Sequence, residues 1–388
     1  MDIKEIDKII QDSIRFIQQK EYRSYDVYDA LTNPLINKIT KGRLLLRRVF
    51  IQLNALSPLS FRFLGMKAIV HTKTLSDMLS VYSLMYAETK EKGWLEKAES
   101  IYQRLLDVRL ETTDGIAWGL RFPYTSRFVD ASEQTPNLYN TACSALAILD
   151  YYEANPSDDI KNKLLRVIDF IFNTLEVTKE EQGVAWIRYY PNQTRPIYNV
   201  NAMVGSFFVR INHLFNEEIV KEDIIAGIIN LLKLGQNPNG SWYYSSTEKG
   251  MWVDGFHTGF LLESLASIYN INKDESLGAI LKKGFEFFRE NLLSKTLIPK
   301  YFDNKLYPIE AQNCAQAIQT LAICSRCLGS DNKKELSAVI QNVNHYLYNP
   351  KGFYYFKKGR VFTNRQYFMR WCHTPMVLAL VHAKNSMK

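Results

Sequence analysis

The stretch NGSWYYSSTEKGMWVDGFHTGFLLESLASIY (239–269) joins a turn that ends in an aromatic residue to a long apolar run rich in small residues. The same pairing of turn and run recurs along the chain, and its aromatic markers are Trp118, Trp186, Trp242, Tyr301 and Tyr355. The interval between successive markers is similar each time and long enough for two helices with their turns. The sequence therefore predicts a helical repeat protein.

Two kinds of helix alternate in this repeat. The segment 157–176 gathers its apolar residues into one stripe and turns its charges away, as a helix on the outside of a structure does. The runs after the markers are apolar on more than one side, which indicates helices packed between neighbours. With an early pair at 3–20 and 73–90, the sequence predicts six inner helices and six outer ones, the latter completed by 94–110, 157–176, 217–234, 275–293 and 333–348.

Six hairpins can close into a ring, because an open stack of repeats leaves apolar ends uncovered. We therefore predict an all-α fold, an (α/α)6 toroid with short β-like turns at its rim. Residues 1–388 would form a single domain, and residues 21–72 an insertion that covers one mouth of the ring.

Composition narrows the classes of function. The 388 residues are 46% hydrophobic and 23% charged, which is typical of a folded globular protein. No stretch approaches the ~18 uncharged apolar residues of a membrane span, and the segment 1–20 does not resemble a signal peptide. We expect a cytoplasmic protein. The basic, apolar segment 36–53 leaves two alternatives, a helix whose apolar face packs on the ring, which is favoured, or peripheral contact with the anionic inner membrane.

The net charge of +8 favours anionic partners. No nucleic-acid motif is present, so an acidic glycan or a lipid-linked oligosaccharide is the expected partner and nucleic acid is not. Five cysteines, an odd number in a large chain, do not resemble a disulfide framework. No nucleotide, flavin or metal motif appears, and neither an organic cofactor nor a metal site is predicted.

The strongest local signal is Asp254 with His257, three residues apart at the start of a predicted inner helix and so on one face of it. Since every inner helix of such a ring starts at the same face, the loops before these helices converge on one mouth. Asn201 follows Trp186 at the same separation at which His257 follows Trp242, which places Asn201 and His257 at the same rim. The structural alternative is that Asp254 only caps the helix and His257 only packs.

The other loops at this mouth supply further candidates for substrate binding. Arg121 and Arg127 lie in a lengthened loop and could hold a carboxylate or phosphate with their forked donors, or form a solvated salt bridge instead. The remaining candidates share only their position in the repeat or in the insertion: Tyr28, Asp29, Asp130, Asn140, Tyr189, Trp252, Lys300, Tyr307, Glu310, Asn313, Arg370, Trp371 and His373.

Three stretches resemble the signature sequences of a helical-toroid family encoded in bacterial exopolysaccharide and O-antigen gene clusters: PNLYNTACSALAIL (136–149), residues 239–265 and PKYFDNKLYPIEAQNCAQAI (299–318). The likeness extends over most of the chain. The fold that it implies is similar to that of polysaccharide lyases, uronate epimerases, unsaturated glucuronyl hydrolases and N-acylglucosamine 2-epimerases. QNPNGSW (236–242) is also similar to the QW repeats of triterpene cyclases, but the acidic DxDD-type motif is absent and terpene cyclisation is not expected.

The rim is richer in Tyr, His, Arg and Asn than in acids, which suits removal of a proton next to a carboxylate held by arginine. We predict a cytosolic carbohydrate-active enzyme of surface-polysaccharide biosynthesis that acts on a uronic-acid-containing or lipid-linked glycan. His257, or a rim tyrosine such as Tyr189 or Tyr307, would move the C5 proton while Asp254 orients His257. Return of the proton to the other face gives epimerisation, and loss of the C4 oxygen gives a lyase.

Two alternatives remain open at this point. One is a glycoside hydrolase that uses Asp254 with Asp29 or Glu310 as its second carboxylate. The other is a non-catalytic glycan-binding or scaffold protein of a polysaccharide assembly complex.

Overall fold

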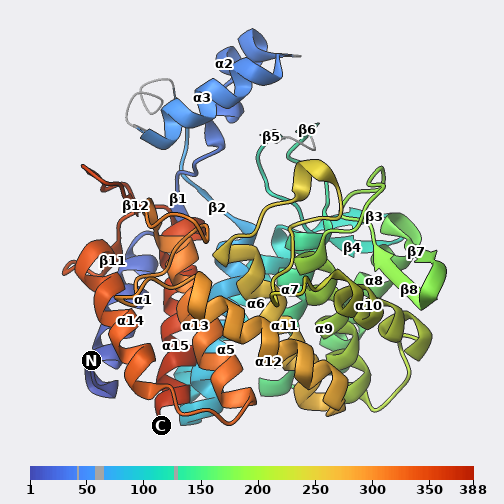
Figure 1. Ribbon diagram of the computed structural model, residues 1–388. Coiled ribbons are helices and arrows are strands. Elements are labelled where there is room, and N and C mark those ends of the chain that lie inside the picture. The colour runs from blue at the N-terminus through green and yellow to red at the C-terminus, as the bar shows by residue number, and fades with distance from the viewer. Residues whose placement is uncertain (42, 57–64, 126–129) are drawn as a thin grey trace.

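The computed structural model describes residues 1–41, 43–56, 65–125 and 130–388, and its helices form a closed ring (Figure 1). Six inner helices contact one another in sequence, and the last of them contacts the first. They are α5 (Thr72–Thr89), α7 (Leu138–Ala154), α9 (Tyr198–Phe215), α11 (Gly255–Asn272), α13 (Ala311–Cys327) and α15 (Thr374–Met387). The predicted (α/α)6 toroid is confirmed.

Six outer helices each pack against the inner ring. They are α1 (Ile3–Gln19), α6 (Lys92–Asp107), α8 (Asp158–Phe170), α10 (Glu222–Gly235), α12 (Glu275–Asn291) and α14 (Lys333–Leu347). In α1 the residues Ile6, Ile10, Ile14 and Ile17 are buried at helical spacing on one face. In α5, by contrast, every residue from Thr72 to Ser83 is buried, as expected of a helix with neighbours on all sides.

Two outer helices are shorter than their sequence periodicity predicts. The α8 helix ends at Phe170 and continues as a single π-helical segment, η2 (Ile171–Leu175). The α10 helix begins at Glu222, because the side chain of Asn212 in α9 binds both the N–H and the carbonyl of Val220 at 2.9 and 2.7 Å. That pair of bonds holds the preceding residues in a turn.

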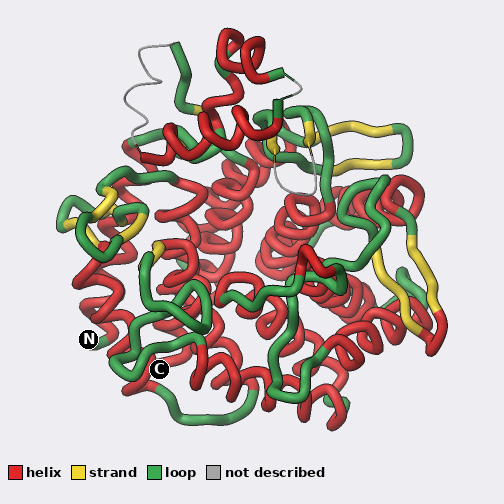
Figure 2. Tube along the Cα trace, turned by 45° about the horizontal axis from the view of Figure 1, so that its top comes forward, coloured by secondary structure: helices red, strands yellow, loops and turns green. Residues whose placement is uncertain are grey.

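The strands all lie in segments that precede an inner helix, at one face of the ring (Figure 2). All pairings are antiparallel: β1 (Arg23–Ser24) with β2 (Ile69–Val70), β3 (Leu110–Thr112) with β4 (Gly115–Ala117), β5 (Tyr124–Thr125) with β6 (Asp130–Ala131), β7 (Val177–Glu180) with β8 (Val184–Ile187), β10 (Tyr348–Asn349) with β11 (Phe353–Tyr354), and β12 (Lys357–Lys358) with both β9 (Ile309–Glu310) and β13 (Thr363–Asn364). Short helical turns η3 (Glu181–Gly183), η4 (Glu248–Gly250) and η5 (Met369–His373) lie in the same segments. At the opposite face the connections are short, for example residues 90–91 and 273–274. We call the strand-bearing face the mouth of the ring.

The aromatic markers of the repeat secure the mouth loops to the outer helices. Trp118 donates its indole N–H to the carbonyl of Leu105 in α6 at 2.9 Å, and Trp242 donates to Leu232 in α10 at 2.8 Å. Both indoles are buried. Each indole makes the same kind of bond to an outer helix, which explains why an aromatic residue recurs at this turn. Trp242 therefore has a structural role.

The insertion contains η1 (Asp29–Thr32), α2 (Pro34–Thr40) and α3 (Leu44–Leu56), and in Figure 1 these stand above the mouth near β5 and β6. The α3 helix contacts η1 and β5. Asn54 fixes it in place by donating to the carbonyls of Asp26 and Val27 and to the Asp29 carboxylate. Within the described residues, no helix has the length and apolar character that crossing a bilayer requires.

Candidate functional site

Asp254 and His257 form a bonded pair at the start of α11. Asp254 is the N-cap of this helix and accepts from the His257 backbone N–H at 2.8 Å, while its other oxygen lies 2.7 Å from His257 Nδ1. That second oxygen also accepts from Trp252 Nε1 at 2.8 Å. Asp254 therefore caps the helix and also contacts the imidazole ring of His257, so its carboxylate does more than cap.

The protonation of this pair follows from its contacts. The Asp254 side chain is 1% exposed, and burial by itself raises the pKa of its carboxyl, but the attraction to a protonated His257 ring and the hydrogen bonds from His257 and Trp252 outweigh burial and hold the pKa below its ordinary value. A carboxylate at Nδ1 favours the tautomer that carries its proton there. Nε2 then keeps its lone pair, on a side chain that is 25% exposed at the mouth. A histidine held in this way by a carboxylate is chemically able to accept a proton at Nε2.

Aromatic rings surround His257. Tyr244 stacks on Trp252 with ring centroids 4.6 Å apart and meets the His257 ring edge-on at 4.7 Å. Together with Asp254 these residues line a small recess. Aromatic faces of this kind suit the apolar faces of sugar rings. Trp252, predicted to contact substrate, thus lies beside the Asp254–His257 pair.

Glu310 approaches the same place from the adjacent repeat, at the end of β9 and the start of α13. Burial raises the pKa of its carboxyl to about 7, with Lys357 opposing and the negative charge of Asp254 adding to the rise. The charges of Asp254 and Glu310 both act on Tyr301, whose pKa burial raises well above 10. Glu310 is therefore able to exchange a proton near neutrality, and Tyr301 stays a phenol.

Further tyrosines share this environment. Burial raises the pKa of Tyr28 far above its ordinary value, with Tyr124 and Glu310 adding to the rise and Arg370 opposing it. Burial also raises the pKa of Tyr189 well above 10, with smaller contributions from neighbouring tyrosines that include Tyr244. Such phenols donate hydrogen bonds at neutral pH and do not act as bases. Of the predicted proton-transfer groups, Tyr189 therefore keeps its phenol proton at neutral pH.

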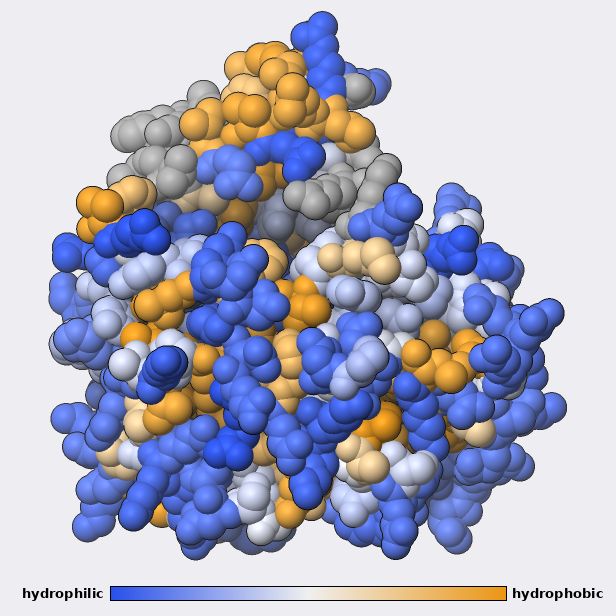
Figure 3. Space-filling model, in the orientation of Figure 1, coloured by the Kyte–Doolittle hydropathy of each residue, from blue (hydrophilic) through white to orange (hydrophobic). Residues whose placement is uncertain are grey.

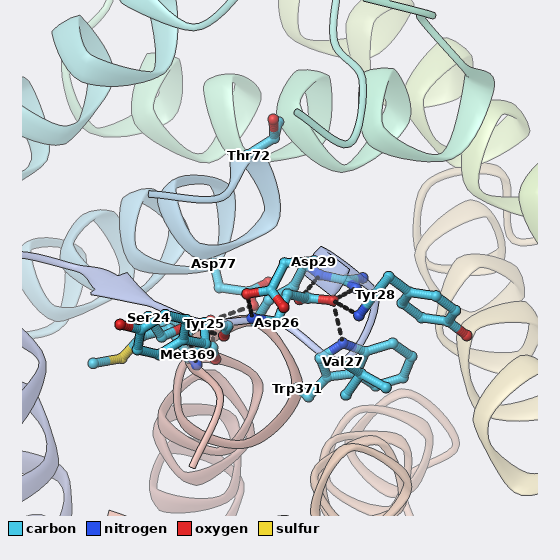
Figure 4. A network of polar contacts seen from close by, with 12 residues as sticks. Ser24, Tyr25, Asp26, Val27, Tyr28, Asp29, Thr72, Asp77, Met369 and Trp371 are labelled. Carbon is cyan, nitrogen blue, oxygen red and sulfur yellow. Dashed lines mark hydrogen bonds and ion pairs between the residues drawn. The ribbon is translucent and has the colours of Figure 1, made fainter. Parts of the chain in front are cut away.

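The insertion and the sixth repeat meet in a buried network (Figure 4). Arg370 in η5 binds both oxygens of Asp26 at 2.8 Å, and Trp371 donates to Asp26 at 3.3 Å. Asp29 is 2% exposed and accepts from the Asp26 backbone N–H at 2.8 Å and from Asn54 at 2.7 Å. Arg370 and Asp29, predicted to bind substrate, therefore hold the insertion on the ring.

The predicted rim amides point into the structure. Asn201 is buried and bonds both to the N–H of Ile187, at 2.7 Å, and to its carbonyl, so that it links α9 to β8. Asn140 is buried and donates to Asn137, the N-cap of α7. Asn313 is buried against the backbone of Gly255, where a Cβ would lie 2.5 Å from its side-chain oxygen. These three amide side chains are therefore buried beneath the mouth and contact the protein itself.

The basic candidates differ in their surroundings. Arg121 is partly exposed and donates to the Val70 carbonyl at 2.7 Å. Lys300 donates to the Asp303 carbonyl in its own turn. Arg127 lies outside the described residues, and Asp130, the acidic candidate of the same loop, begins β6.

Two candidates remain. His373 is fully buried and stacks on Phe16 with centroids 5.1 Å apart, and burial lowers its pKa to about 3, so it is a neutral packing residue. Tyr307 is half-buried against the core and precedes the cis peptide bond to Pro308.

Sequence reasoning missed the polar groups inside the ring. A cavity of about 560 Å³ extends along the inner helices, and Phe256 and Phe260 of α11 are among the residues that line it. The Phe256 ring centroid lies 5.3 Å from that of His257. Lys73 pairs with Asp77 in its wall at 2.5 Å. Burial raises the pKa of Glu263 to about 8, and its carboxyl accepts from Gln316, Gln319 and Thr320. The available signal was the presence of charged residues within runs otherwise apolar on every side. All five cysteines are free thiols.

The sequence matches no protein-family model and no curated protein. Solved structures do share its fold. The cellobiose 2-epimerase of Bacillus thermoamylovorans is 14% identical, with 82% of this chain and 87% of that one covered at a TM-score of 0.63. A D-mannose isomerase is 10% identical, with 82% and 86% covered at a TM-score of 0.61. A family 76 glycoside hydrolase, an α-mannanase of Bacteroides thetaiotaomicron, is 12% identical, with 81% and 86% covered at a TM-score of 0.60. At such identities the likeness establishes the (α/α)6 fold alone.

Proposed function

We propose that this protein is a carbohydrate-active enzyme that transfers a proton at a sugar carbon, with Nε2 of His257 as the base. The observation that carries the proposal is the Asp254–His257 pair, with its nitrogen–oxygen distance of 2.7 Å, set among tyrosines at the mouth of the ring. An epimerase, an isomerase and a mannanase with the same fold support a sugar as substrate, as an argument by analogy of fold.

The chemistry proceeds from the contacts of these residues. His257 takes a proton from a carbon next to a carbonyl or carboxylate, and the ionised Asp254 stabilises the imidazolium that forms. In this proposal the phenols of Tyr189 and Tyr301, which keep their protons at neutral pH, donate hydrogen bonds to the enolate oxygen. Glu310, with its pKa near 7, delivers a proton to the opposite face, which inverts the carbon. Expulsion of the C4 oxygen in place of that step makes the reaction an elimination.

The substrate that we propose is an acidic glycan, uronic-acid-containing or lipid-linked, of surface-polysaccharide biosynthesis. Its support is electrostatic. Burial lowers the pKa of Arg121, and the positive charge of nearby Arg23 lowers it further, against the opposing charge of Glu133. A bound carboxylate or phosphate relieves the repulsion between the two arginines and accepts forked hydrogen bonds.

A glycoside hydrolase is the second candidate, and the raised pKa of Glu310 is what favours it, because a general acid must hold its proton near neutrality. In this case Glu310, and not Asp254, is the proton donor. Both Asp254 oxygens already accept hydrogen bonds from the protein.

Deuterium exchange tests the proposal. Acidic glycans are incubated with the protein in heavy water and analysed by NMR and mass spectrometry. We expect deuterium at one sugar carbon, lost in His257→Ala and retained in the control His345→Ala, which removes an exposed histidine of α14. New reducing ends that depend on Glu310, without exchange at carbon, would establish hydrolysis instead. Glycan binding without either reaction would establish a binding or scaffold role.

A further inference from the structure

The insertion presents an unusual number of apolar side chains to solvent. Six large ones on α2 and α3 are between 46% and 74% exposed: Leu35, Ile39, Leu44, Leu45, Val49 and Leu53. We call this set the α2–α3 patch. It is visible at the top of Figure 3. Contiguous apolar exposure of this kind marks an interaction surface.

Helix geometry separates this patch from the face that packs. In α3, Ile51, Asn54 and Ala55 are buried toward the ring, whereas Leu45, Val49 and Leu53 recur every fourth residue on the other side. The favoured expectation that the apolar face of segment 36–53 packs on the ring therefore accounts for only one side of the helix. The outward side has no partner within the described residues.

Basic residues flank the patch. Residues 30–72 contain seven Lys and Arg and no Asp or Glu, so this segment carries +7 of the formal net charge of +8. Lys38, Lys41, Arg43 and Arg48 are exposed beside the apolar stripe. An apolar stripe edged by cations is the pattern of a helix that lies in the interface of an anionic bilayer.

A second element of the mouth has the same character. At the tip of the β12–β13 hairpin, Val361 is 87% exposed and Phe362 is 65% exposed, and the neighbouring Arg360 is exposed as well. Asn364 in β13 donates to the Ala55 carbonyl at the end of α3 at 2.7 Å, which ties the hairpin to the insertion. Both elements belong to the face of the ring where His257 lies.

We propose that the α2–α3 patch docks on an anionic lipid surface, with the mouth of the ring turned toward the membrane. A second copy of the chain fits poorly, because a two-fold contact sets this patch against itself. The segment 30–72 of each copy, with a formal charge of +7 and no acidic side chain, would then face the same charge on the other copy. Lipid phosphates supply the missing negative charge, and acyl chains cover the apolar stripe. Docking in this way presents the site to a glycan carried on a lipid, which deepens the proposed function but does not depend on it.

Vesicle co-sedimentation tests the docking directly. We expect the purified protein to sediment with vesicles of equal parts phosphatidylglycerol and phosphatidylcholine and to remain in solution with pure phosphatidylcholine. Arg43→Ala with Arg48→Ala should weaken binding about 30-fold, from the usual contribution of two basic residues near an anionic surface. Leu45→Glu with Val49→Glu should abolish it. Added salt should weaken the wild type, since surface charges are screened.

Matched variants on another face serve as controls. Leu234→Glu replaces a side chain that is 62% exposed on α10, and Lys282→Ala with Lys283→Ala removes two exposed cations from α12. All should bind vesicles as the wild type does. Thermal unfolding followed by circular dichroism should be unchanged in every variant, since the replaced side chains are exposed. Equal binding by Leu45→Glu/Val49→Glu, binding to neutral vesicles alone, or a dimer in light scattering that this variant dissociates would overturn the proposal. These outcomes need no activity, so they separate failure of the docking from failure of the proposed reaction.

Discussion

Replacing Asp254 by Asn distinguishes catalysis from helix capping at one residue. Asparagine is as good an N-cap as aspartate, and α7 already begins with one, since Asn137 accepts from the Asn140 backbone N–H at 2.9 Å. In Asp254→Asn the side-chain oxygen keeps the bond to the His257 backbone. The amide nitrogen then faces His257 Nδ1 and Trp252 Nε1, where the carboxylate oxygen stood.

This substitution reverses the tautomer of the His257 imidazole. An amide N–H donates to Nδ1 and drives the ring proton to Nε2, so the nitrogen at the mouth loses its lone pair. In a triad the equivalent change lowers kcat by about 10⁴-fold, and we expect a loss of about 10³- to 10⁴-fold in proton exchange. The free energy of unfolding should fall by only about 1–3 kcal/mol, for the charge-assisted bond to His257 and the unpaired indole N–H of Trp252.

Two measurements check this expectation. Nitrogen-15 NMR of His257 should place the proton on Nδ1 in the wild type and on Nε2 in Asp254→Asn, without any need for substrate. Deuterium exchange into the glycan then reports the rate. The control Asn137→Asp makes the converse change at an equivalent cap and should leave exchange unaltered. Retention of the wild-type tautomer, or of exchange close to the wild-type rate, would refute the role of Asp254 as orienting group.

Three further results follow from the described contacts. If protonated Glu310 supplies a proton, activity should fall as pH rises through about 7, and Glu310→Gln should remove this limb of the pH profile together with most of the activity. The pKa of Glu263 is raised from 4.5 to about 8 in the folded protein, so its contribution to stability is complete below pH 4.5 and declines as pH rises to about 8. The free energy of unfolding, measured by urea titration, should therefore depend less on pH in Glu263→Gln than in the wild type. An unaltered dependence would contradict the assigned burial. Trp242→Phe should lower the free energy of unfolding by about 1–3 kcal/mol, because the Leu232 carbonyl loses its donor, and equal stability by urea denaturation would show that the indole N–H is dispensable.

The ring could be predicted from sequence because its information is local and repeated. Each hairpin carries the helical period within the length of a single helix, and Trp118 and Trp242 mark equivalent turns with equivalent bonds. Asp254 and His257 were predictable for the same reason, since their spacing on one helix fixes their relative position. The end of α8 at Phe170 and the start of α10 at Glu222 were less predictable. A π-helical segment sets the first, and the hydrogen bonds of Asn212 set the second.

Contacts between distant parts of the chain were beyond such reasoning. The bond between Asp26 and Arg370 spans 344 residues, and no pattern in either segment specifies the other. For that reason Arg370 and Asp29 resembled rim residues in the sequence, although the structure uses them to attach the insertion. Asn201 and Asn313 point inward because buried backbone groups near them require hydrogen-bond partners or close packing.

The direction of the inner helices adds a reason for the chemistry to occur at this face. All six inner helices begin at the mouth, and the N-terminal end of a helix carries a partial positive charge from its unpaired N–H groups. Their potential favours the ionised form of Asp254 and any negative charge that develops on a substrate oxygen. In the proposed reaction, the helix ends would therefore stabilise an enolate formed at the mouth, in addition to the proposed hydrogen bonds from the tyrosines. The opposite face, where the same helices end, has the reverse polarity and would destabilise the same intermediate, so proton abstraction from carbon is expected at the mouth alone.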